Sequence, residues 1–215
     1  MPDPLPAHND LKSRLQAEDE TALAELFSGQ RDRLLRMIDF RMDERLRSRL
    51  WPDDVLQDAF LAARQRLGRI AADGFESPFV WLRMVVHQTL IDLHRRHLGA
   101  QMRDAGREVS LEGRRFSQTT SASMAIHLVG DWTTPTQAAV RSERFETVKR
   151  TLEQMEPLDR EILALRHFEE LTNGEAAEEL GIQAKAASIR YVRALGRLKQ
   201  ILSERPGLLL EEDAL

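Results

Sequence analysis

Apolar residues recur at three- and four-residue steps along two stretches of the chain, from about residue 9 to 97 and from about 137 to 202. This spacing places them on one face of successive helices. Between the two stretches the periodicity fades, and Ser, Thr and Gly become frequent, as is typical of a linker. The pattern predicts an all-α protein with helical modules at 9–98 and 138–204, a flexible linker at 99–137 and a tail at 205–215.

Two helix starts stand out in the first module. The sequence WPDD at 51–54 has proline at the first helical position and acids in the first turn, and its helix is expected to stop near Gly68. Ser77 and Pro78 then serve as N-cap and first position of another helix. The apolar stripe of that second helix consists of Leu82, Val85, Val86, Leu90 and Leu93.

The second module contains the spacing of a helix-turn-helix. Thr172 and Glu175 match a capping box, and Gly181 can take the left-handed conformation that ends a short helix. Ala177 precedes that glycine by four residues, where two crossing helices leave no room for a larger side chain, and Ile182 fills the corner. The helix that follows has one apolar stripe, formed by Ala187, Tyr191, Ala194, Leu198 and Ile201.

Charge is segregated along this motif. The first helix carries only acids, whereas the segment from Ile182 to Leu202 carries five cations and no acid, although the formal net charge of the chain is −4. A recognition helix needs cations that reach phosphates and base edges. A basic face that is merely solvated is the alternative. The predicted base-reading residues are Lys185, Ser188, Ile189 and Arg190; those expected to meet phosphates or solvent are Arg193, Arg197 and Lys199.

Composition narrows the function classes. The chain has no cysteine, which excludes disulfides and thiol catalysis. Neither a secretory h-region nor an apolar run long enough for a membrane helix occurs, so we expect a cytoplasmic protein without membrane insertion. His94 and His97 are three residues apart, but no carboxylate or thiol cluster accompanies them, and no catalytic triad order or phosphate-binding glycine loop is found. We therefore expect no metal site, no cofactor and no enzymatic activity.

Three blocks in order resemble bacterial RNA polymerase sigma factors of the extracytoplasmic-function (ECF) group, in the sigma-70 family. They are WPDDVLQDAFLAARQRLGRI at 51–70, SPFVWLRMVVHQTLIDLHRRH at 77–97, and the stretch from Met155 to Leu202. The resemblance implies a promoter-specificity subunit whose partners are the RNA polymerase core and promoter DNA, with an anti-sigma factor as a possible further partner. The sequence departs from the usual family pattern at KAASIRYVRALGRLK and at Gln88. These departures bear on promoter specificity.

The same resemblance assigns roles to each block. The block at 51–70 is expected to dock on the clamp helices of the largest polymerase subunit through Asp53, Asp54, Gln57, Asp58 and Phe60. The block at 77–97 and the loop before it are expected to open the −10 element, while the helix-turn-helix reads the −35 element. The candidate −10 residues are Phe75, Arg83, His87, Gln88, Arg95 and Arg96.

Two other function classes fit parts of the sequence. An ordinary transcription regulator would pair the helix-turn-helix with a sensing or dimerising domain, and an adaptor would bind protein only. The acidic and basic helices at 51–97 argue against a sensor. The five cations of the last helix argue against the adaptor.

Overall fold

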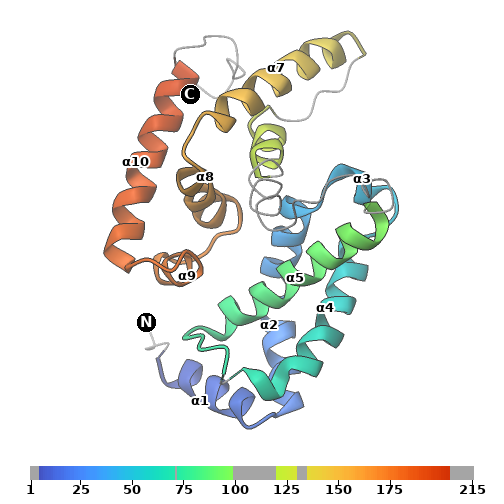
Figure 1. The fold of residues 1–215 in the computed structure, drawn as a ribbon, viewed down its shortest axis with the longest axis vertical. Helices are drawn as coiled ribbons and strands as arrows, with labels where there is room; N and C mark the ends of the chain where they lie inside the picture. The colour runs from blue at the N-terminus through green and yellow to red at the C-terminus, as the bar shows by residue number, and fades with distance from the viewer. Residues whose placement is uncertain (1–4, 71, 99–119, 130–134, 204–215) are drawn as a thin grey trace, which may run out of the picture. The chain divides into compact units, whose positions relative to one another are not determined.

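The structure, a computed structural model, describes residues 5–70, 72–98, 120–129 and 135–203 (Figure 1). All regular elements in these ranges are helical, which confirms the predicted all-α class. The chain divides into two compact units, residues 1–105 with 177–182 and residues 106–176 with 183–215. Most of the predicted linker, at 99–119 and 130–134, lies outside the described residues, as does the tail from 204 onward.

The first unit is a bundle of α1 (Leu5–Gln16), α2 (Glu20–Arg41), the short α3 (Glu44–Arg47), α4 (Pro52–Arg66) and α5 (Pro78–Leu98). A 3-10 turn at Leu67–Arg69 ends α4. Helices α2, α4 and α5 each pack against the other two. Their shared core includes Leu34, Ile38, Val55, Ala59, Trp81 and Val85, all fully buried.

Local signals set the ends of these helices as predicted. Proline opens α4, and the helix stops two residues before Gly68. The Ser77 hydroxyl accepts a hydrogen bond from the backbone N–H of Val80 at 3.5 Å, at the start of α5. The predicted stripe of α5 is buried from Leu82 to Leu93. These starts fix the direction in which α4 and α5 present their polar faces.

The second unit contains a helix at 120–129, then α7 (Pro135–Glu153), α8 (Pro157–Leu163), a π-helical turn (Ala164–Phe168), the start of α9 (Asn173–Glu179) and α10 (Ala184–Ser203). The helix at 120–129 meets the π-helical turn through the rings of His127 and Phe168, whose centroids are 5.4 Å apart. Helix α8 packs against α10.

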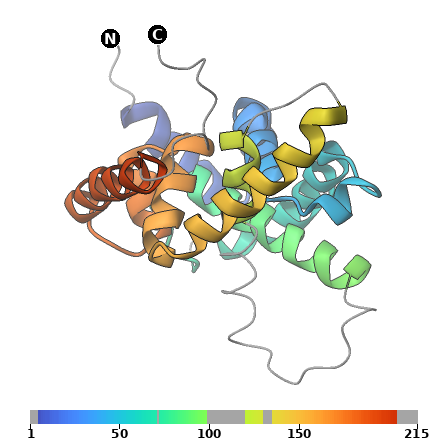
Figure 2. The same ribbon diagram turned by 90° about the horizontal axis from the view of Figure 1, so that it is seen from above.

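A buried arginine fixes the corner between α7 and α8, where the chain turns sharply (Figures 1 and 2). Arg160 donates through Nη1 to the carbonyl oxygens of Leu152 at 2.9 Å and Met155 at 2.8 Å. Leu152 lies in the last turn of α7 and Met155 just after it, where backbone carbonyls lack partners within the helix. Burial lowers the pKa of Arg160. The corner that supports α8 is therefore fastened by side-chain hydrogen bonds.

Candidate nucleic-acid interface

The capping box predicted before α9 is present. The backbone N–H of Thr172 donates to the Glu175 carboxylate at 2.8 Å, and the N–H of Glu175 donates to the Thr172 hydroxyl at 3.2 Å. In addition, the Asn173 side-chain amide donates to the carbonyl of Ala184 at 2.7 Å. This last bond joins the first residue of α9 to the first residue of α10 and fixes where the second helix begins.

The turn between the two helices has the predicted glycine geometry. Gly181 has a φ of +62°, a conformation that is costly for residues with a Cβ. The N–H of Ile182 donates to the carbonyl of Ala177 at 3.0 Å, the bond that closes a Schellman-type helix end. Ala177 is buried, as the helix-turn-helix spacing requires.

Helix α10 has one buried line and one outward line. Ala187 and Ala194 are fully buried, and the predicted stripe is continued by the half-buried Tyr191, Leu198 and Ile201. On the opposite side Ile189 is 44% and Val192 is 64% exposed. The exposed polar residues Lys185, Ser188 and Arg193 lie near this apolar pair, as the helical period requires. These five residues form the outward line of α10.

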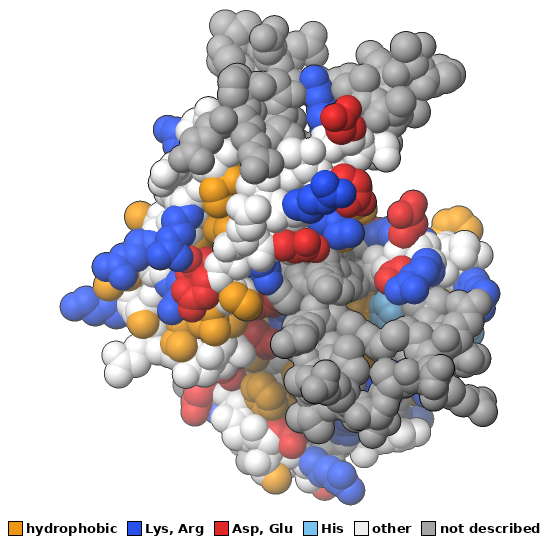
Figure 3. Space-filling model, turned by 45° about the horizontal axis from the view of Figure 1, so that its top comes forward, with side chains coloured by type: hydrophobic (Ala, Val, Ile, Leu, Met, Phe, Trp, Pro, Cys, Tyr) orange, Lys and Arg blue, Asp and Glu red, His pale blue; other side chains and the backbone are white. Residues whose placement is uncertain are grey.

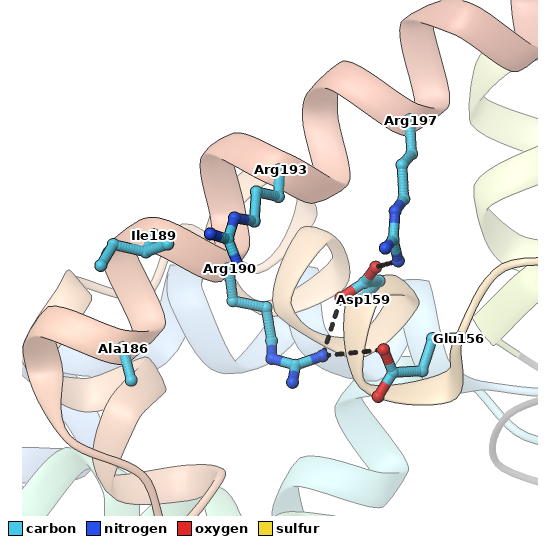
Figure 4. Close-up of a pocket in the computed structure, with 7 residues that line it drawn as sticks. All are labelled: Glu156, Asp159, Ala186, Ile189, Arg190, Arg193 and Arg197. Carbon is cyan, nitrogen blue, oxygen red and sulfur yellow. Dashed lines mark hydrogen bonds and ion pairs between the residues drawn. The ribbon is translucent and has the colours of Figure 1, made fainter.

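Two arginines on the flank of α10 are engaged by acids of the α8 segment (Figure 4). Arg190 Nη1 lies 2.8 Å from Asp159 Oδ1 and 3.2 Å from Glu156 Oε2. Arg197 Nη1 donates to the other oxygen of Asp159. The Asp159 side chain is 4% exposed, and these groups line a pocket of about 370 Å³ together with Arg193.

The basic helix is thus partly neutralised in space. Burial lowers the pKa of Arg190, but its hydrogen bonds and attraction to Glu156 and Asp159 outweigh burial and raise the pKa overall. The segment from Ile182 to Leu202 contains no acid, but two of its five cations, Arg190 and Arg197, pair with acids that lie 31 to 38 residues earlier in the chain. Figure 3 accordingly shows Lys and Arg side chains interspersed with Asp and Glu on the face drawn, rather than one continuous basic surface.

In the first unit, four of the residues predicted to dock lie exposed along α4: Asp53, Asp54, Gln57 and Asp58. Asp54 also accepts a hydrogen bond from the backbone N–H of Trp51 at 2.9 Å, so it caps the helix. Asp53 pairs with Arg31. Phe60 is half-buried, and its ring meets that of Phe27 edge-on, with centroids 4.9 Å apart. The structure therefore groups the polar residues on the surface and turns Phe60 towards α2.

Two exposed apolar residues, one at the N-cap of α4 and one within the helix, were not predicted. Trp51 is 76% exposed and Leu61 is 55% exposed. Together with Asp54 and Asp58 they follow steps of three, four and three residues, so all four share one face. The spacing alone contained this signal, since the stripe lies opposite the buried Leu56 and Ala63.

The candidate −10 residues fall into different environments. Phe75 is half-buried in the loop after Gly74, whose φ is +72°. Arg83 is 1% exposed and therefore differs from Arg95 and Arg96, which are exposed at the end of α5.

The other candidates on α5 are the half-buried His87 and Gln88. The Gln88 amide donates to Asp92 at 3.4 Å, and Arg95 Nη1 lies 3.9 Å from the same carboxylate. Asp92 therefore contacts one residue a turn before it and one a turn after it along α5.

Comparisons with known proteins bear on both units. Residues 145–198 match the family model described as Sigma-70, region 4. The RNA polymerase sigma factor YlaC of Bacillus subtilis (strain 168) is 27% identical over 151 residues, which cover 70% of this chain and 77% of that protein. A solved structure of CnrH in complex with the cytosolic domain of CnrY has a TM-score of 0.48 and 22% identity, covering 92% of this chain and 98% of that one. Among the described residues, none of the helices has the length and apolarity to cross a bilayer.

Proposed function

Because the chain belongs to the sigma-70 family of RNA polymerase sigma factors, in its ECF group, we propose that its helix-turn-helix reads −35 DNA while its first module docks on polymerase and opens −10 DNA. A role in transcription initiation and a DNA-binding region 4 follow from the family. The family is generally non-catalytic, and its work beside the polymerase implies a cytoplasmic location. The division of labour between the modules is the proposal.

The outward line of α10 is the single observation that carries the −35 assignment. A recognition helix places its N-terminal residues against base edges, and Lys185, Ser188 and Ile189 are exposed in the first turns of α10. Val192 extends the apolar part of this line, and Arg193 supplies a cation for the phosphate backbone. Arg190 and Arg197 belong to a different group, because Asp159 engages both.

The exposed face of α4 supports docking on a protein partner. Asp58 and Gln57 offer a polar surface, and Trp51 and Leu61 add exposed apolar area beside it. Interfaces combine an apolar contact with surrounding charges that select the partner. A basic helical surface, such as the clamp helices of the largest polymerase subunit, has the complementary character.

The loop before α5 and the end of α5 support the −10 assignment. Opening a duplex requires an aromatic platform for unstacked bases and cations for the displaced strand. Phe75 is part of the loop, and Arg95 and Arg96 are exposed on the last turns of the helix. Arg83 is buried and pairs with Glu179 at 2.6 Å, so we assign it to this ion pair rather than to DNA.

Run-off transcription with purified core polymerase tests this function. Adding the chain to core should produce defined transcripts from a subset of genomic fragments, whereas core alone should not. The isolated chain should bind the same duplexes weakly, because each module makes few contacts and a common platform is needed to join them. Tight, sequence-specific duplex binding without polymerase, together with no core-dependent transcripts, would instead identify an ordinary regulator.

A further inference from the structure

Asp159 presents one carboxylate oxygen to each of two arginines of α10. Oδ1 lies 2.8 Å from Arg190 Nη1, and Oδ2 accepts from Arg197 Nη1. The two arginines are seven residues apart and therefore stand two turns apart on the same side of the helix. A carboxylate that bridges them in this way occupies the position that a DNA phosphate would take between two cations.

We propose that Asp159 is a built-in phosphate mimic, which withholds Arg190 and Arg197 from the DNA backbone and so limits the non-specific affinity of the recognition helix. The proposal rests on the function proposed above, in which α10 lies against −35 DNA. It assigns a role in specificity to a residue outside the helix-turn-helix.

The burial of Asp159 is what makes the mimic effective. Its side chain is 4% exposed, whereas those of Arg190 and Arg197 are 31% and 57% exposed. If either arginine moved to a phosphate, the buried carboxylate would lose a partner and keep its charge, and an uncompensated buried charge is costly. Glu156 adds a second acceptor for Arg190 at 3.2 Å. Exchange to a phosphate is therefore disfavoured most at Arg190.

The remaining cations of α10 have no such competitor. Within the part of the chain that the structure describes, Lys185, Arg193 and Lys199 have no carboxylate at ion-pair distance. Phosphate contacts form on any DNA sequence. Withholding two cations of α10 from the phosphates therefore lowers non-specific binding in particular. Contacts of Ile189 and Val192 with base edges are unaffected, and the ratio of specific to non-specific affinity rises.

The matched pair Arg193→Gln and Arg197→Gln tests the proposal with the full-length chain. Binding to a fluorescent non-promoter duplex is measured by anisotropy at several salt concentrations starting from low salt. Each phosphate contact contributes about 0.9 to the slope of log K against log [salt]. Arg193→Gln should flatten the slope by about 0.9, whereas Arg197→Gln should leave it unchanged.

The variant Asp159→Asn should produce the opposite change. Freeing two cations should steepen the slope by up to about 1.8, with several-fold tighter non-specific binding at low salt. Glu156→Gln should have a smaller effect, because Glu156 contacts Arg190 and leaves Asp159 in place. Circular dichroism checks that each variant is folded, and the arginine pair decides the question if Asp159→Asn does not fold.

The outcomes separate this proposal from the proposed function. If Arg197→Gln flattens the slope as much as Arg193→Gln does, Arg197 meets phosphate and Asp159 is no mimic. An unchanged or flatter slope for folded Asp159→Asn overturns the proposal in the same way. If Arg193→Gln has no effect and promoter transcription also persists, α10 does not contact DNA as proposed, and the −35 assignment itself fails.

Discussion

The backbone N–H of Trp51 donates to the carboxylate of Asp54 at 2.9 Å, which closes the first turn of α4. A residue predicted to contact polymerase is therefore also part of the fold. Replacing Asp54 alters the helix start as well as any interface, so the docking surface is better tested at neighbouring exposed positions.

Asp58→Lys should weaken binding to core polymerase at least tenfold, because it places a cation where the proposed partner surface is basic. Asp58 is exposed, so the free energy of unfolding should change by no more than about 0.5 kcal/mol. Asp54→Lys should in contrast cost about 1 kcal/mol of stability through the lost cap. Co-purification with core and chemical denaturation measure the two effects; normal recovery of core with Asp58→Lys would remove this residue from the interface.

The apolar part of the same face makes a separate prediction. Trp51→Ser and Leu61→Ser should each weaken the complex with core, since they remove exposed apolar area from the contact. The free chain should keep its stability. Leu56→Ser is the matched control, because Leu56 is buried in α4 and its replacement should lower the unfolding midpoint. Should the exposed substitutions leave affinity for core intact, Trp51 and Leu61 serve no docking role.

The exposed pair on α10 predicts recognition of thymine methyl groups. Ile189 and Val192 project apolar side chains from the outward line, and the C5-methyl of thymine is the apolar feature of the major groove. Replacing a contacted thymine by deoxyuridine in the −35 element should cost about 0.8 kcal/mol, or roughly fourfold in transcription. With Ile189→Ala or Val192→Ala the thymine and deoxyuridine templates should become equivalent. Equal activity of the two templates at every −35 position with the unmodified protein would refute methyl readout.

Two glycines of the C-terminal motif should respond to alanine with opposite signs. Gly181 has positive φ, so Gly181→Ala should destabilise the protein by about 1 kcal/mol. Gly196 lies inside α10, and a Cβ added there meets no atom within 4 Å. Gly196→Ala should therefore stabilise by roughly 0.5–1 kcal/mol. Urea denaturation of the two variants provides the comparison; stabilisation by Gly181→Ala would mean that the turn does not need a left-handed residue.

The helix ends were predictable because their signals are local. The Thr172–Glu175 capping box, Gly181 and the proline starts at 52 and 78 each act within four residues, and all are present. The helix at 120–129 was harder to predict, because its pattern is short and the residues around it resemble a linker. Similarity to sigma factors was predicted from three ordered blocks, and the comparisons confirm it through the match of residues 145–198 to Sigma-70, region 4, and through a sigma factor that is 27% identical over 151 residues.

The environment of the candidate site could not be predicted in the same way. Asp159 and its arginines are 31 and 38 residues apart in sequence, so no local charge pattern shows that they meet. Arg83 matches the polar spacing of α5, yet it is buried and pairs with Glu179, 96 residues later in the chain, a contact that the spacing of α5 does not indicate. The roles of the individual DNA and polymerase contacts remain predictions.

The bridge from Asp159 to Arg190 and Arg197 has a consequence for how promoter preference can evolve. A change at either arginine alone leaves the buried Asp159 short of a cation, so that single step is costly. Substitutions at 159, 190 and 197 should therefore appear together in homologous sequences, whereas positions 185, 189 and 192 can vary one at a time. New −35 preferences would then arise first along the outward line of α10, with the bridged flank inherited unchanged.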